Sequence, residues 1–255
     1  MAKKPLLVAM ALSATLLAGC QHTGGINTDL AVSSGLSAYK AATLSDADAK
    51  AIADSGCQEM DSQNKIAPAS SQYAKRLKTI AKSLGGDIDG TKINYKVYLT
   101  KDVNAWAMAN GCVRVYSGLM DMMTNNEVEG VLGHELGHVS LGHSRKAMQT
   151  AYATVAARDA VSATSGVASV LTQSQLGDIA EGAINSAFSR SQESDADDFS
   201  YDLLKKRGIT TQGLVGSFDK LAALSGAESK SLFDSHPPST ERAQHIRDRI
   251  ATDKK

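Results

Sequence analysis

The chain has 255 residues, enough for one good-sized domain with a single core or at most two small domains. Its 27 basic residues balance its 27 acidic ones, so the net charge offers no attraction to nucleic acid. Aromatic residues make up only 5% of the chain, which favours a helix-rich protein over an all-β sandwich.

The first twenty residues have the pattern of a processing segment. Lys3 and Lys4 form a positive start, an apolar stretch runs from Pro5 to Leu17, and small residues follow. The segment is too short to span a membrane. We therefore expect residues 1–19 to be a signal peptide.

The end of this segment, Leu17-Ala18-Gly19-Cys20, resembles the lipobox of bacterial lipoproteins. The resemblance implies that Cys20 begins the mature chain and carries several acyl chains, palmitate among them, which together give stable anchoring. Because Gln21 rather than aspartate follows, we expect an outer-membrane location facing the periplasm. An ordinary secretory signal and an unmodified structural cysteine are the alternatives.

Lipidation of Cys20 leaves Cys57 and Cys112, an even number in an oxidising compartment. We expect these two to form a disulfide between the N-terminal helical region and a strand in the middle of the chain. Two separately buried thiols are the alternative.

Two helices are predicted in the N-terminal part of the mature chain. Ser45, with Asp48 three residues later, begins the first, which runs to about Cys57. Ser70 or Ser71 begins the second, which ends at Gly85-Gly86.

A small antiparallel sheet is predicted next. Apolar side chains alternate from Ile93 to Leu99, as in a half-buried strand. Two further strands, Asn104 to Ala109 and Cys112 to Tyr116, meet across Asn110-Gly111. Asn-Gly is a strong hairpin signal, because both central residues of a two-residue turn must tolerate positive φ.

An edge strand of this sheet could bind an extended peptide by adding it as a further strand. We therefore take four residues as candidates for substrate binding: Asn110, Gly111, Cys112 and Val113. A hairpin that serves only as scaffold is the alternative.

A metal-binding motif follows the sheet, His134-Glu135-Leu136-Gly137-His138. Residues four apart on a helix are offset by roughly 40° around its axis, so both imidazoles can bind one metal ion. The carboxylate of Glu135 lies at the rim of that face, where it can reach a metal-bound water without binding the metal.

The helix that carries this motif has a clear start. Thr124 and Glu127 form a capping box, and an apolar stripe follows at Val128, Val131, Leu132 and Leu136. His143 lies five residues after His138, whereas the metzincin pattern needs six. We therefore place His143 at the surface or behind the metal ligands.

The region 147–188 is rich in small residues and is interrupted by Arg158 and Asp159. These charges argue against a membrane span, and amphipathic helices near the cleft are predicted instead.

A catalytic zinc ion has three protein ligands and one open position, so the motif needs a third donor. Glu193 is the best candidate, and Asp197 follows one helical turn later on the same face. Asp197 could orient a ligand histidine through its free ring nitrogen. The alternative is a surface acidic helix, to whose solvated face Asp195 and Asp198 belong.

Together, these motifs resemble the HtpX and CAAX-prenyl-protease type of zinc endopeptidases, within the gluzincins. The resemblance covers roughly Asn104 to Ile246, and it includes the HELGH core, the block 189–197 and His236-Pro237-Pro238 followed by Arg242. One departure is Asn110-Gly111, where relatives commonly have Gly-Gly.

The resemblance implies an α+β fold, a mostly helical zincin-like metallopeptidase domain with a small sheet beside the motif helix. It implies one Zn²⁺ held by His134, His138 and Glu193, with Glu135 as general base and acid and Asp197 behind the ligands. His236 is implied either to stabilise the oxyanion or to occupy the open zinc position. Arg242 is implied to assist catalysis or to bind substrate.

We therefore expect an endopeptidase that cleaves unfolded or damaged periplasmic or outer-membrane proteins by Glu-assisted attack of zinc-bound water. Its expected partners are such substrates, the outer membrane through the lipid, and other envelope quality-control proteins, but no nucleic acid. A chaperone-like binding lipoprotein with a closed zinc site is the alternative. The expected division is a signal peptide (1–19), a lipidated tether (20–36) and one domain (37–255), with covering helices (37–88) before the catalytic part (89–255).

Overall fold

The computed structural model describes residues 44–159, 171–224, 235–236 and 240–253. The expected signal peptide, Cys20 and the tether lie outside the described residues, as do Pro237 and Pro238. Within the described part, no helix is long and apolar enough to cross a membrane.

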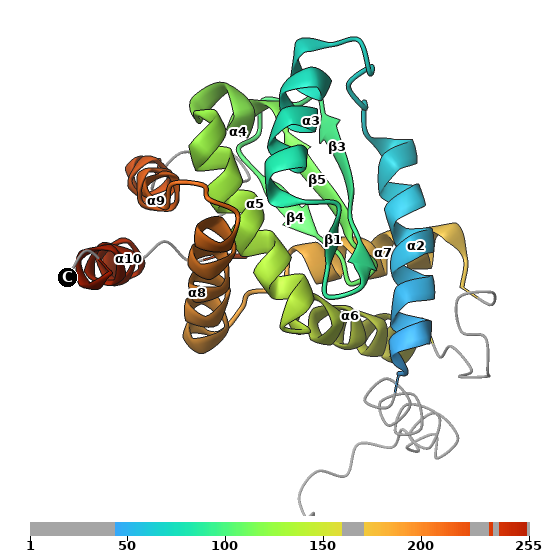
Figure 1. Ribbon diagram of the computed structural model, residues 1–255. Coiled ribbons are helices and arrows are strands. Elements are labelled where there is room, and N and C mark those ends of the chain that lie inside the picture. Colours follow the sequence, from blue (N-terminus) through green and yellow to red (C-terminus); the bar gives the residue numbers. More distant parts are fainter. Residues whose placement is uncertain (1–43, 160–170, 225–234, 237–239, 254–255) are drawn as a thin grey trace, which may run out of the picture.

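Helices surround a small sheet, so the expected α+β class is confirmed (Figure 1). Two helices come first, α2 (Asp46–Gln63) and α3 (Gln72–Leu84). The strands are β1 (Asp87–Ile88), β2 (Thr91–Lys92), β3 (Asn94–Tyr98), β4 (Ala105–Ala107) and β5 (Cys112–Tyr116). The later helices are α4 (Ser117–Met122), α5 (Asn125–Ser140), α6 (His143–Asp159), α7 (Gln173–Ile184), α8 (Arg190–Lys206), α9 (Gln212–Ala223) and α10 (Thr240–Thr252).

The two N-terminal helices begin where their caps predict. The Ser45 side chain accepts a hydrogen bond from the Asp48 backbone at the start of α2, which continues past Cys57 to Gln63. Ser71 caps α3, and Gly85 ends it with a φ of 101° that a side chain would disfavour. Local capping chemistry therefore decides both starts.

The main sheet has the strand order β3-β5-β4. Strands β4 and β5 pair antiparallel as expected, whereas β3 and β5 pair in parallel. The prediction of a purely antiparallel sheet is therefore wrong for β3. The chain runs along β3, returns along β4 and then inserts β5 between them, so the first and third strands point the same way.

The hairpin between β4 and β5 has a longer loop than the expected two-residue turn. The Met108 backbone nitrogen donates to the Cys112 carbonyl, and that of Gly111 donates to the Met108 carbonyl. Only Gly111 has a positive φ, of 82°, while Asn110 does not. The turn therefore spans residues 108–111, and the asparagine needs no left-handed conformation.

Two hydrophobic cores lie on opposite faces of this sheet. Val113 and Val115 of β5 belong to the core that α3, α5, α8 and α9 complete. Cys112 belongs to the second core, with side chains of α2, α6 and α7. Figure 1 shows α8, α9 and α10 on the side of α5 away from the sheet. The motif helix α5 is thus held between the sheet and the C-terminal helices.

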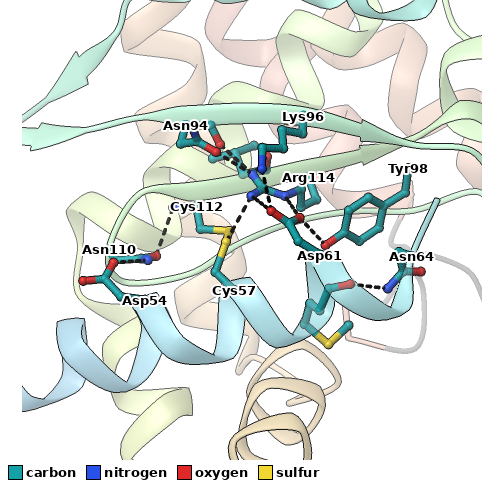
Figure 2. The surroundings of a disulfide bond; sticks show 12 residues. Asp54, Cys57, Asp61, Asn64, Asn94, Lys96, Tyr98, Asn110, Cys112 and Arg114 are labelled. Atoms are coloured by element: carbon teal, nitrogen blue, oxygen red, sulfur yellow. Dashed lines mark hydrogen bonds and ion pairs between the residues drawn. A yellow bond between two sulfur atoms is a disulfide. The ribbon is translucent and has the colours of Figure 1, made fainter. Parts of the chain in front are cut away.

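Cys57 of α2 and Cys112 of β5 are joined by the expected disulfide (Figure 2). Beside it, Arg114 is only 1% exposed, and its guanidinium donates to the Asp61 carboxylate at 2.8 and 2.9 Å. Burial would raise the pKa of Asp61, but the hydrogen bonds from Arg114 and Lys96 outweigh it and lower that pKa to about 2. A covalent bond and a buried ion pair therefore fasten α2 to the sheet.

Candidate metal centre

The motif helix α5 starts and packs as its sequence predicts. Thr124 and Glu127 form the capping box, with both reciprocal hydrogen bonds present. The four residues of the predicted apolar stripe are all buried: Val128, Val131, Leu132 and Leu136. The helix is therefore a fixed platform for the motif side chains.

A row of glycines brings α5 unusually close to the C-terminal helices. A Cβ atom on Gly130 would lie 2.7 Å from the backbone of Leu214 in α9. A Cβ on Gly137 would lie 3.0 Å from the carbonyl oxygen of Ala196 in α8. These contacts are tighter than side chains on α5 would allow, and they bring the acidic residues of α8 within reach of the motif histidines.

Four side chains converge beside α5: His134, His138, Glu193 and His236. Their ligand atoms all lie within 4.8 Å of one another. The Nε2 atoms of His134 and His138 are 3.0 Å apart, and Nε2 of His134 is 3.1 Å from Nδ1 of His236. Oε1 of Glu193 is 2.9 Å from that Nδ1 atom. The two helices and the segment carrying His236 therefore supply one compact set of donors.

This arrangement fits a bound cation. All four side chains are buried, and burial lowers the pKa of His138 well below its usual value, so its imidazole is neutral. A Glu135 carboxylate oxygen, Oε1, is also buried without a hydrogen-bond partner among the described residues. Ring nitrogens that face one another at hydrogen-bond distance need a proton or a metal ion between them. Three imidazoles and one carboxylate suit a divalent transition metal.

Asp197 and Arg242 bond to the donor side chains on the side away from the centre. The Asp197 carboxylate, fully buried, bonds with Nδ1 of His134 at 2.7 Å, which directs Nε2 into the centre. Arg242 donates to both Asp197 oxygens at 2.7 and 2.6 Å and pairs with Oε2 of Glu193 at 2.5 Å. Burial would raise the pKa of Asp197, but its bonds to Arg242 and His134 outweigh that and lower it. Arg242 thus contacts the carboxylates of the centre.

Two other acidic residues of α8, Asp195 and Asp198, were expected on a solvated face and do not join the centre. Asp195 is exposed, and Asp198 pairs with His245 and Arg249. The helix therefore has one buried acidic face and one solvated acidic face.

Glu135 lies next to the donors without joining them. It is 3% exposed, and its Oε1 atom is 3.6 Å from Nε2 of His236. Burial raises the pKa of Glu135, although the nearby His236 and His134 oppose the shift. A carboxyl group with a raised pKa at the edge of a metal centre is suited to take up and release a proton near neutral pH.

His236 lies inside the donor set. It is 5% exposed, and burial would lower its pKa, but the charge of Glu135 and the bond to Glu193 raise it overall. Of the two roles that the resemblance implies, the position of His236 among the other donors would suit a fourth metal ligand.

Two residues near the centre were not identified as site residues from the sequence. Nδ1 of His143 is 3.0 Å from Nδ1 of His138, so His143 lies behind a candidate ligand. The ring of Phe188 stacks on that of His138 with centroids 3.8 Å apart. Of the two positions expected for His143, at the surface or behind the metal ligands, the structure has the second, whereas we find no sequence signal for Phe188.

The four residues predicted to bind substrate lie in the hairpin loop and in the middle of the sheet. Asn110 donates to Asp54, while Cys112 and Val113 are buried in β5. Strand β5 pairs with β3 on one side and β4 on the other. Cys112 and Val113 therefore have no free edge for a peptide, and the prediction is corrected for these two. The edge strand nearest α5 is β4.

Comparison with known proteins decides the family. The model of peptidase family M48 matches residues 71–250. The chain belongs to peptidase family M48. It is 74% identical to Metalloprotease YcaL and 57% identical to Metalloprotease LoiP, both of Escherichia coli (strain K12), over 98% of each chain. Protease HtpX of Actinobacillus pleuropneumoniae is 30% identical over 59% of this chain and 64% of its own.

Membership of family M48 confirms the resemblance stated from the motifs, and it makes the chain a metalloprotease. The matched range contains the motif helix and all four donors. The converging donors are therefore a candidate metal site of this metalloprotease.

Proposed function

We propose that this M48 chain is a zinc-dependent endopeptidase that cleaves unfolded or damaged proteins of the periplasm or the outer membrane. One observation carries the proposal. A buried carboxylate, Glu135, lies beside a set of imidazole and carboxylate donors without being one of them. Catalytic zinc sites combine such a donor set with an adjacent carboxylate that moves protons.

His134, His138 and Glu193 would hold the zinc ion, which would supply the Lewis acidity that lowers the pKa of water and polarises a carbonyl group. Glu135 takes a proton from the attacking water and later gives it to the leaving amine. Asp197 and Arg242 keep the ligand side chains in place. Burial raises the pKa of Glu135, which makes its carboxylate a stronger base for the proton of the attacking water.

His236 is proposed to hold the resting enzyme latent. Its Nδ1 atom lies 3.1 Å from Nε2 of His134 and 2.9 Å from Oε1 of Glu193, among the other donors. A protein ligand in the fourth position leaves no place for water or substrate. Catalysis therefore requires His236 to withdraw, after which its imidazole can stabilise the oxyanion.

The free edge of β4 is proposed to hold the substrate in extended form. Met108 and Asn104 bond to β5 through the Cys112 carbonyl and the Tyr116 nitrogen. In an antiparallel ladder such bonds fall on every second residue, so Trp106 also faces β5. The backbone groups of Ala107 therefore point away from β5, where a peptide can add as a strand. Ala107 also lines the cavity that contains Glu135 and His236.

The cellular setting is proposed from the sequence. Cys20 would carry the lipid, residues 20–36 would form the tether, and residues 37–255 would form the domain, with the covering helices 37–88 first. The disulfide between Cys57 and Cys112 supports an oxidising compartment. Other envelope quality-control proteins are the proposed partners.

The test is digestion of unfolded casein by the purified protein with zinc. We expect cleavage that a chelator stops and zinc restores. Glu135→Gln should keep stoichiometric zinc and lose activity by orders of magnitude, because the proton acceptor is gone. Activity retained in this variant would contradict the mechanism.

The four-donor set also favours a second candidate, a binding lipoprotein whose closed zinc site is structural. His236→Ala separates the two. Cleavage that appears or increases in this variant supports a latent protease. Stoichiometric zinc without cleavage of several unfolded substrates, by either form, supports the binding protein.

A further inference from the structure

Two cavities lie along β4 and share a wall. The first contains Glu135 and His236 and is lined on the β4 side by Trp106 and Met108. The second has a volume of about 270 Å³, and Asn104, just before β4, lines it. Ile184 lines both cavities, and Ser235, next to His236, lines the second. The second cavity therefore adjoins the cavity of the reacting centre, and we call the two together the groove.

The second cavity is acidic. Asp102 and Glu181 line it, and no lysine, arginine or histidine does. No ion pair or side-chain hydrogen bond of either carboxylate occurs among the described residues. Lys101 adjoins Asp102 in sequence but is exposed and does not line the cavity.

The negative charges of both carboxylates affect the same group in this cavity, the hydroxyl of Tyr116. The pKa of Tyr116 is raised, first by burial and then by the charges of Asp102 and Glu181. The two acidic groups therefore reinforce each other at this wall of the groove.

The geometry of β4 relates the two cavities to an extended peptide. Side chains of Asn104, Trp106 and Met108 lie on one face of the strand, because the side-chain period of a strand is two residues. Asn104 lines the second cavity, and the other two line the first together with Ala107, which lies between them. A peptide paired with the edge of β4 likewise presents every second side chain to that face, at intervals of about 7 Å.

We propose that the groove selects substrates with a lysine or arginine side chain in the acidic cavity. That residue lies two or four positions from the residue that occupies the cavity beside Glu135. The even spacing follows from the shared face of β4, and the positive charge follows from Asp102 and Glu181. The proposal rests on the peptidase function proposed above and names a feature of its substrates.

The expected preference is moderate. Partly exposed ion pairs are weak individually, and a like charge in the cavity is repelled, so we expect about a tenfold preference for lysine over glutamate at that position. The preference should shrink at high ionic strength, because salt screens partly exposed charges.

The test uses the full chain with zinc and a set of fluorogenic peptides. Each peptide carries one lysine, norleucine or glutamate at one position, scanned across both sides of the scissile bond. Values of kcat/KM are compared for the wild type, His236→Ala, the pair Asp102→Asn and Glu181→Gln, and the pair Asp102→Lys and Glu181→Lys. Binding of labelled peptides to zinc-loaded Glu135→Gln, measured by fluorescence anisotropy, gives a readout that needs no turnover.

Asp178→Asn is the matched control. Asp178 lies one turn before Glu181 on α7, pairs with Arg158 and lines neither cavity. It should retain the wild-type preference. The neutral pair of substitutions should abolish most of the lysine preference, and the pair of lysine substitutions should favour glutamate instead.

Cleavage without discrimination between lysine and glutamate at any position would overturn the acidic subsite and leave the peptidase function standing. The acidic subsite would also be overturned by a lysine preference that the pair Asp102→Lys and Glu181→Lys leaves unchanged. A lysine preference confined to odd spacings would overturn it as well. Selective binding of lysine peptides without cleavage would support the subsite and contradict the peptidase function. Absence of both cleavage and selective binding would overturn both proposals.

Discussion

Gly133 of α5 and Ser200 of α8 are in direct contact. A Cβ atom on Gly133 would lie 2.5 Å from Oγ of Ser200, which itself donates to the Gly130 carbonyl at 2.9 Å. The contact sets how closely α8 approaches the motif helix. It thereby sets the distance between Glu193 and the motif histidines.

Gly133→Ala should therefore destabilise the protein, although alanine favours helix. Overpacking costs about 1–3 kcal/mol, and the gain in helix propensity offsets about 1 kcal/mol of it. We expect a net loss of up to about 2 kcal/mol in the free energy of unfolding, measured by urea denaturation. Zinc affinity should fall as well, because α8 carries a ligand.

Gly177→Ala on α7 is the matched control. Its Cβ would meet nothing closer than 3.6 Å, so the same substitution should stabilise the protein by about 0.5–1 kcal/mol. Equal effects of the two substitutions would contradict the argument from close approach. Adding Ser200→Ala to Gly133→Ala should recover part of the loss.

Asp197→Asn should weaken zinc binding by about 10–100-fold, because the carboxylate orients His134 and holds Arg242. Zinc affinity is measured by competition with a chromophoric chelator. Asp198→Asn, next to it on α8, is the control, since Asp198 pairs with His245 and Arg249. Unchanged affinity in Asp197→Asn would exclude the orienting role.

His143→Ala should weaken zinc binding by about tenfold, because Nδ1 of His138 loses the neighbour that orients its ring. The same chelator competition measures the effect. His245→Ala removes a histidine that pairs with Asp198 instead, and it should leave the affinity unchanged. Similar affinities for the two variants would show that His143 has no positioning role.

Acid should destabilise the protein through Asp61. The pKa of its carboxyl group falls from an ordinary value of 3.8 to about 2 in the folded protein. Above the higher value the carboxylate is charged in both states and its ion pair with Arg114 contributes fully. As the pH falls towards the lower value, the unfolded state takes up the proton first, so stability falls.

Asp61 should account for about 1–2 kcal/mol of the stability lost on acidification, after allowance for partial solvent access. Asp61→Asn should lack this part of the pH dependence. At neutral pH it should be less stable by about 3 kcal/mol, because Arg114 remains buried without its partner. Parallel pH profiles for the two proteins, from chemical denaturation, would contradict this assignment.

Features that depend on a few neighbouring residues could be predicted from the sequence. Ser45, Ser71 and Thr124 start their helices because each side chain caps a backbone amide within three residues. The motif at His134 and His138 determines the metal chemistry for the same reason, since helical geometry places both rings on one face.

Features that depend on contacts between distant segments could not be predicted from the sequence. The place of β5 between β3 and β4 depends on how the returning chain packs, and local alternation carries no information about it. The same holds for Phe188, which stacks on His138 from another segment. His143 lies behind His138 because α6 leaves the end of α5 at a particular angle.

Residue types and their spacing within single helices were enough to predict the metal-binding motif. Glu193 and Asp197 could be proposed from the same spacing on their own helix. Only the tertiary structure decided that His236 lies among the donors and that β4, rather than β5, presents the free edge. Both depend on how segments far apart in the sequence pack together, which the local pattern of residues does not specify.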